Sequence, residues 1–185
     1  MFERWHKKGE ILDRKQVYSG PVYGVQKLHI KTPDGLTVER DLIKCDPTVT
    51  ILAMTSDQKI VMNSEYRVGI NAESVSLPAG IINPGENSLA AAKRELQEET
   101  GYVASSVKEM INITSSEGFM DQTCALMLVK FDPKNRVSTH FDHDEFVSSS
   151  LVDYSQVMDW IKQGKINTAQ TISAVTYFTL FEKNQ

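Results

Sequence analysis

One stretch of the chain, Gly80–Tyr102, constrains the fold and the chemistry more than any other. It opens with GIINPGEN, and the glycines and proline of that segment are typical of a turn-rich loop. Asn87 or Ser88 can cap a helix, and Leu89–Thr100 contains strong helix formers with neither glycine nor proline. Gly101 follows, where a helix that ends in a left-handed residue favours glycine. The stretch therefore predicts a loop, then a helix, then a sharp stop.

The acidic residues of this predicted helix gather on one side. At about 100° per residue, Glu95, Glu98 and Glu99 fall within an arc of about 100°. Like charges so placed repel one another and destabilise an isolated helix by about a few tenths of a kcal/mol. The carboxylates therefore either point into bulk water or hold a cation, and hard oxygen ligands of this kind suit Mg²⁺ or Mn²⁺.

The spacing of these residues resembles the signature of the Nudix hydrolases. The positions that carry the resemblance are Gly80, Glu86, Arg94, Glu95, Glu98, Glu99 and Gly101, followed by Tyr102 where the family usually has an aliphatic residue. Nudix enzymes depend on Mg²⁺ and cleave a nucleoside diphosphate linked to another group. The resemblance implies an α+β fold, an α/β/α sandwich with a mixed sheet.

Similarity to one group of this family, the ADP-ribose pyrophosphatases, extends over nearly the whole chain. The matching segments are the N-terminal strands, Glu65–Arg67, Leu77–Gly80, Ser115–Phe119 and Trp160–Ile166. The resemblance implies a homodimer in which the N-terminal strands of one subunit contribute to the substrate site of the other. It also implies a small-molecule nucleotide substrate.

Length and composition fit a soluble protein with one substantial core. The chain has 185 residues, of which 41% are hydrophobic and 24% charged. Its net charge of −4 argues against a nucleic-acid binder, and no apolar run reaches the ~20 residues of a membrane span. Two cysteines are too few for a disulfide framework, and the first residues lack the apolar stretch of a signal peptide. We therefore expect a cytoplasmic protein.

Periodicity and turn residues predict the order of the remaining elements. Strands are expected at 10–19, 22–32, 36–44, 48–55, 60–66, 107–114, 122–131 and 146–152, a polar loop at 134–145, and helices at 154–163 and 168–181. In the central helix, Leu89, Ala92 and Leu96 should face the core. The first strands carry few large apolar residues, so residues 1–45 are expected to form an antiparallel β-ribbon that needs another surface, either that of the main domain or that of a second subunit in a dimer. Residues 46–185 would form the catalytic domain.

The resemblance implies a set of metal ligands in the signature. Glu95 and Glu99 would bind the metal, Glu98 would bind it directly or through water, and the backbone carbonyl of Ala79 would complete the protein ligands. Arg94 stands four residues before Glu98 and could orient it through a charge-assisted hydrogen bond. The alternative is a simple ion pair on the helix surface.

Several residues compete for the role of general base. The resemblance favours a glutamate in the late loop, and Glu145 matches that position. His143 is a second candidate, because a neutral imidazole can accept a proton near pH 7. Glu98 is the third, and a solvated acidic loop without a catalytic role is the alternative for the first two.

Substrate contacts are predicted from charge and from position. Arg67 ends a strand next to the signature loop, and its guanidinium matches phosphate oxygens. Gly80 and Glu117 lie at positions that the resemblance places near substrate. Glu117 stands where the ADP-ribose enzymes often have proline, and Ser76 stands where they often have glutamate. The linked group is therefore left open.

The sequence as a whole predicts a hydrolase that acts on the phosphoanhydride of a nucleoside diphosphate. ADP-ribose or another nucleoside diphosphate sugar would give a nucleoside monophosphate and a sugar phosphate. One alternative is a Nudix hydrolase of a nucleoside triphosphate or a dinucleotide. Another is a non-catalytic nucleotide-binding regulator, although such a protein would be expected to lose carboxylates that this chain retains.

Overall fold

The computed structural model describes residues 8–139 and 147–183, and the chain divides into two compact units. The first, here called the ribbon unit, comprises Met1–Asp46 and Thr114–Gln122. The second, here called the sandwich unit, comprises Pro47–Ile113 and Thr123–Gln185. Each unit has its own sheet.

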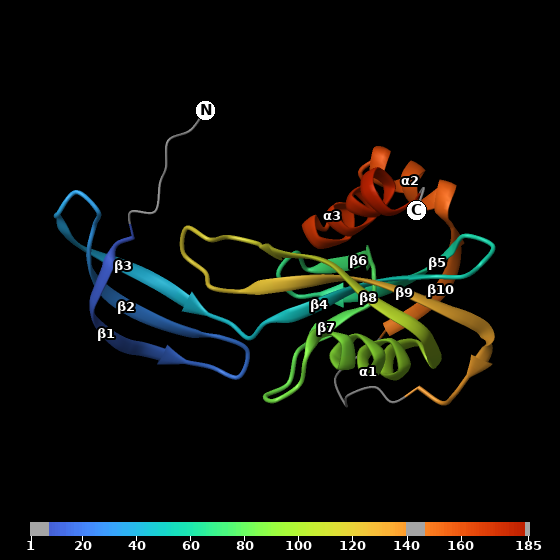
Figure 1. Ribbon diagram of the computed structural model, residues 1–185, viewed down its shortest axis with the longest axis horizontal. Helices are drawn as coiled ribbons and strands as arrows, with labels where there is room; N and C mark the ends of the chain where they lie inside the picture. The colour runs from blue at the N-terminus through green and yellow to red at the C-terminus, as the bar shows by residue number, and fades with distance from the viewer. Residues whose placement is uncertain (1–7, 140–146, 184–185) are drawn as a thin grey trace. The chain divides into compact units, whose positions relative to one another are not determined.

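The ribbon unit contains an antiparallel sheet in the order β1-β2-β3 (blue in Figure 1). Its strands are β1 (Glu10–Ser19), β2 (Gly24–Lys31) and β3 (Thr37–Lys44), which confirms the predicted N-terminal strands. The turn before β3 places Gly35 at φ +94°, a conformation that glycine adopts without steric cost. Every residue of β1 is exposed, so this strand covers no core within its own unit.

The sandwich unit is built on a mixed sheet. Its strands are β4 (Thr48–Met54), β5 (Lys59–Arg67), β6 (Ala72–Ser76), β7 (Ala79–Ile81), β8 (Tyr102–Thr114), β9 (Thr123–Arg136) and β10 (Val147–Asp153). The main order is β10-β5-β4-β9-β8, while β6 pairs with β5 and β7 pairs with β4. The β4–β9 pair is parallel and the β4–β7 pair antiparallel. The short strand β7, which leads into the signature loop, therefore lies beside the central strand β4.

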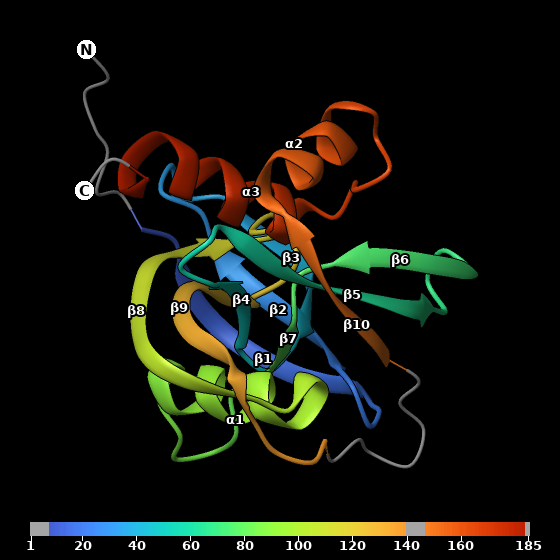
Figure 2. The ribbon, with the colours of Figure 1, turned by 90° about the vertical axis from the view of Figure 1, so that its right-hand side faces the viewer.

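Helices cover both faces of this sheet, as Figure 2 shows. Alternate residues of β4 point to opposite sides: Val49, Ile51 and Ala53 pack with α1 (Ser88–Thr100), and Leu52 and Met54 pack on the side of α2 and α3. The last helices are α2 (Tyr154–Lys162), α3 (Ala169–Tyr177) and the π-helical turn η1 (Phe178–Glu182). The predicted α/β/α sandwich is confirmed. In the part of the chain that the structure describes, no helix is both long and apolar enough to cross a membrane.

Two local expectations were wrong. Leu89 remains 43% exposed, and the core side of α1 is formed by Ala91, Ala92 and Leu96. Helical angle does not determine where along its axis a helix meets a sheet, and Leu89 lies in the first turn. Strand β9 also continues to Arg136, into the segment expected to be a polar loop, because the end of this strand is exposed and can be polar.

Both ends of α1 form as predicted. Asn87 caps the helix, with its Oδ1 accepting a hydrogen bond of 2.9 Å from the backbone N–H of Ala90. At the other end Gly101 adopts φ +74° and donates its N–H to the carbonyl of Gln97 at 2.8 Å. These caps determine where the acidic helix begins and ends.

Replacement of Gly101 should lower the stability of the fold by more than its positive φ angle alone implies. A Cβ at this position would overlap the carbonyl oxygen of Val137, whereas a Cβ at Gly164, which has φ +71°, would meet no atom. We expect Gly164→Ala to cost about 1 kcal/mol and Gly101→Ala about twice as much. Thermal unfolding of both variants measures the difference, and equal melting temperatures would contradict the predicted overlap.

Candidate active site

The signature loop brings β7 close to the helix that follows it. Residues Ala79 and Gly80 pair with Thr50 and Val49 of β4, and α1 begins a few residues later. The Glu95 carboxylate packs so tightly against Gly80 that a Cβ on this glycine would overlap it. A side chain at residue 80 would therefore displace the Glu95 carboxylate, which glycine leaves in place.

Arg94 lies at the centre of a cluster of carboxylates. Its Nε and Nη2 donate to the two oxygens of Glu86 at 3.1 and 2.9 Å, a bidentate arrangement. Its Nη1 donates to Glu95 Oε1 at 2.7 Å and to Glu98 Oε2 at 2.9 Å. Nη2 also donates to the backbone carbonyl of Ile81 at 2.8 Å. One guanidinium thus ties the loop to two carboxylates of the helix.

The charges of this cluster stabilise one another. The hydrogen bonds from Arg94 hold the pKa of Glu86 below its ordinary value, and the surrounding carboxylates raise the pKa of Arg94 further. The side chains of Arg94, Glu86 and Glu95 are 27, 16 and 13% exposed, so water screens these pairs less than it screens a surface pair. Arg94 therefore does more than form the single helix-surface ion pair considered as the alternative.

Glu99 is buried and bonds to the sheet. It is 7% exposed, and its Oε2 accepts a hydrogen bond of 2.8 Å from Nδ2 of Asn63 on β5. Ser149 of β10 donates its hydroxyl to Asn63 Oδ1 at 2.7 Å and to the Glu99 backbone carbonyl at 3.3 Å. Sequence reasoning missed Asn63 and Ser149. The available signal was the asparagine that interrupts the apolar run of β5.

The donor set of α1 fits a hard divalent cation, since it consists of carboxylate oxygen atoms, and the Glu95 carboxylate lies directly against the backbone of Gly80. Among residues 8–139 and 147–183, however, no three His, Cys, Asp or Glu side chains are grouped closely enough to hold a metal ion. Arg94 engages Glu95 and Glu98, while Glu99 bonds to Asn63. A cation would have to compete with these contacts.

The other expected site residues have different surroundings. Arg67, at the end of β5, is half exposed and forms an ion pair of 2.9 Å with Glu65. Glu117 belongs to the ribbon unit, where it accepts a hydrogen bond of 3.5 Å from the Thr114 hydroxyl. The two late-loop candidates for the general base, Glu145 and His143, lie outside the described residues.

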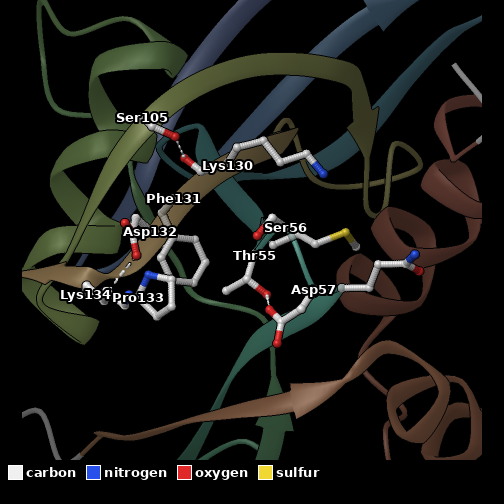
Figure 3. A pocket seen from close by; sticks show the side chains of 11 residues that line it. Thr55, Ser56, Asp57, Ser105, Lys130, Phe131, Asp132, Pro133 and Lys134 are labelled. Carbon is white, nitrogen blue, oxygen red and sulfur yellow. Dashed lines mark hydrogen bonds between the residues drawn. The ribbon is translucent and has the colours of Figure 1, made fainter.

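A pocket of about 730 Å³ opens at the other end of β4 (Figure 3). It is lined by the turn after β4, including Thr55 and Asp57, and by Lys130, Phe131 and Lys134 of β9. Thr55 donates its hydroxyl to Asp57 at 2.6 Å. None of the side chains predicted for the active site lines this pocket, so it is separate from the carboxylate helix.

The α/β/α sandwich and its carboxylate-bearing helix define a Nudix-type enzyme fold. A model of the NUDIX domain matches residues 45–174, and the chain belongs to this family. It is therefore a Nudix hydrolase.

Relatives match over almost the full length of the chain. It is 33% identical over 173 residues to a methanol dehydrogenase activator from Bacillus methanolicus, with 94% of each chain covered. It is 29% identical over 176 residues to an ADP-ribose pyrophosphatase from Bacillus subtilis, with 95% of each covered. A crystal structure of an ADP compounds hydrolase has the same fold, with a TM-score of 0.85 at 20% identity over 99% of this chain and 98% of that one.

Proposed function

We propose that this chain is a divalent-metal-dependent pyrophosphatase that cleaves the diphosphate of a nucleoside diphosphate linked to another group, with ADP-ribose or another nucleoside diphosphate sugar as substrate. The observation that carries the proposal is the partly buried carboxylate cluster around Arg94, on a helix whose Glu99 is held against the sheet. The ADP-ribose pyrophosphatase among the relatives supports the substrate class.

The proposed chemistry follows from the charge of a diphosphate. Its negative oxygens repel a nucleophile, so catalysis must neutralise that charge, place a water in line and accept the proton of the water. Mg²⁺ or Mn²⁺ held by Glu95, Glu99, Glu98 and the Ala79 carbonyl would supply the neutralising charge. Water adds to one phosphorus as the bridging P–O bond breaks, which yields a nucleoside monophosphate and a sugar phosphate.

The remaining roles belong to the side chains. Arg94 holds Glu95 and Glu98 in place through its hydrogen bonds. Arg67 is proposed to contact a substrate phosphate, with Gly80 and Glu117 in contact with other parts of the substrate. For the general base the candidates are Glu145, His143 and Glu98. The pH dependence of kcat in their Gln variants identifies it, because loss of the base removes the acidic limb of the profile.

Hydrolysis of a panel of nucleotides tests the proposed function. ADP-ribose, other nucleoside diphosphate sugars, dinucleotides and nucleoside triphosphates are incubated with the protein and Mg²⁺, and the products are separated. We expect turnover of a diphosphate-linked sugar, dependent on Mg²⁺ and abolished by EDTA. Turnover of triphosphates or dinucleotides alone would overturn the proposed substrate. If none of the nucleotides is hydrolysed, the proposed activity is overturned.

A second candidate function is the activation of another enzyme. The observation that favours it is the similarity to a protein named methanol dehydrogenase activator. Addition of this chain to a methanol dehydrogenase, with and without Mg²⁺, tests it. Activation that persists when the carboxylates of α1 are neutralised would favour a regulator that acts by binding, whereas activation that disappears with them would require hydrolysis.

We propose in addition that the ribbon unit forms a homodimer. Strand β1 and the turn after it expose several large apolar side chains, namely Ile11, Leu12, Val17, Tyr18, Val22 and Tyr23. Exposed apolar groups of this kind mark interaction surfaces. Sedimentation equilibrium tests the dimer, and charged substitutions at Leu12 and Val17 should shift a dimer to monomers.

The free cysteines, Cys45 and Cys124, suit a reducing compartment such as the cytoplasm.

A further inference from the structure

A polar network interrupts the apolar face of the sheet beneath α1. The other buried positions on this face of β4 and β5 are aliphatic, namely Val49, Ile51, Ala53 and Val61. Asn63 follows two residues after Val61 on the same face and is only 3% exposed. An amide in such a position costs free energy unless it is hydrogen-bonded, so its partners indicate why it is present.

The orientation of Asn63 follows from the chemistry of its partners. An ionised carboxylate can only accept hydrogen bonds, so the NH₂ end of the amide faces Glu99, with Asn63 Nδ2 at 2.8 Å from Glu99 Oε2. The carbonyl end then faces Ser149, whose hydroxyl donates to it at 2.7 Å. Asn63 and Ser149 are direct neighbours in the β5–β10 ladder. The pairing of these two strands therefore places the Ser149 hydroxyl where it stabilises the amide orientation that Glu99 requires.

Glu99 needs such a partner because of its place in the helix. It is the penultimate residue of α1, where the partial negative charge of the helix end disfavours a carboxylate. Burial disfavours the charged form as well. A hydrogen bond from a rigid strand offsets both effects and restricts the side-chain torsions of the glutamate.

We propose that Asn63, oriented by Ser149, is a positioning residue that presents the Glu99 carboxylate to the catalytic cation. The inference rests on the proposed function, in which Glu99 is a metal ligand. Loss of a residue that hydrogen-bonds to a metal ligand typically weakens metal binding by about 10–100-fold. Asn63 and Ser149 would then act through Glu99 without contacting substrate.

The experiment measures Mn²⁺ binding to the intact protein without substrate, by electron paramagnetic resonance, together with kcat, KM and the melting temperature. Asn63→Leu keeps the branching of the side chain and removes its donor. We expect this variant to bind Mn²⁺ about tenfold more weakly, with lower kcat and unchanged KM for the nucleotide. Ser149→Ala should weaken Mn²⁺ binding severalfold, and it serves as the test if Asn63→Leu fails to fold.

Two controls separate positioning from simple destabilisation. Val61→Ala removes buried volume from the same face of β5, so it should lower the melting temperature without changing Mn²⁺ affinity. Glu99→Gln changes the proposed metal ligand itself and should weaken Mn²⁺ binding. If Glu99→Gln weakens Mn²⁺ binding while Asn63→Leu and Ser149→Ala bind as the wild type does, only the positioning role is overturned. If the wild type does not bind Mn²⁺, the metal site of the proposed function fails and the positioning role fails with it.

Discussion

Replacement of Glu99 by glutamine is expected to reduce kcat by about two orders of magnitude or more, a loss comparable to removal of a key electrostatic contact in other enzymes. The amide has the shape of the carboxylate, and its oxygen can still accept the hydrogen bond from Asn63. What it lacks is the negative charge that a divalent cation requires. The fold should therefore persist while hydrolysis and cation binding are lost.

A matched carboxylate-to-amide change controls for general effects of charge. Glu109 on β8 accepts a hydrogen bond of 2.6 Å from the Ser88 hydroxyl at the start of α1 and has no proposed role in catalysis. Glu109→Gln should hydrolyse the substrate at the wild-type rate. Steady-state kinetics at saturating Mg²⁺ compares the two variants. Wild-type kcat in Glu99→Gln would remove Glu99 from the proposed metal site.

Arg94→Ala is expected to impair both stability and activity. The substitution removes the hydrogen bonds to Glu86, Glu95 and Glu98 and leaves partly buried carboxylates without their cation. Breaking a fully buried pair costs about 3–5 kcal/mol, and the partial exposure of this cluster reduces our expectation to about 2–3 kcal/mol. For a chain of this size that loss lowers the melting temperature by roughly 5–10 °C.

Two further substitutions show whether geometry or charge matters at Arg94. Arg94→Lys keeps the positive charge but not the planar fork that bonds both oxygens of Glu86, so it should fall between the wild type and Arg94→Ala. The adjacent Lys93 is exposed on the same helix, and Lys93→Ala should change little. Differential scanning calorimetry measures the melting temperature of each variant, and steady-state kinetics measures its activity. A melting temperature of Arg94→Ala equal to that of Lys93→Ala would contradict the proposed role of the cluster.

Local chemistry made the acidic helix and its loop predictable from sequence. Asn87 and Gly101 mark the helix ends because capping depends on a few adjacent residues. The spacing of Arg94 and Glu98 brings them to one side of any α-helix, and they are hydrogen-bonded in the structure. Periodicity and turn residues predicted most of the strands, and the resemblance to the Nudix family implied the layers of the sandwich.

The surroundings of Glu99 could not be predicted in the same way. Helical periodicity grouped Glu99 with Glu95 and Glu98, yet its side chain turns to Asn63, which lies 36 positions away in the chain, and Ser149 is 86 positions from Asn63. These residues meet because β5 and β10 are neighbours in the sheet, and strand pairing depends on the packing of the whole core. Sequence spacing therefore identified the acidic residues that we propose to carry the chemistry, and long-range packing selected the strand residues that hold Glu99.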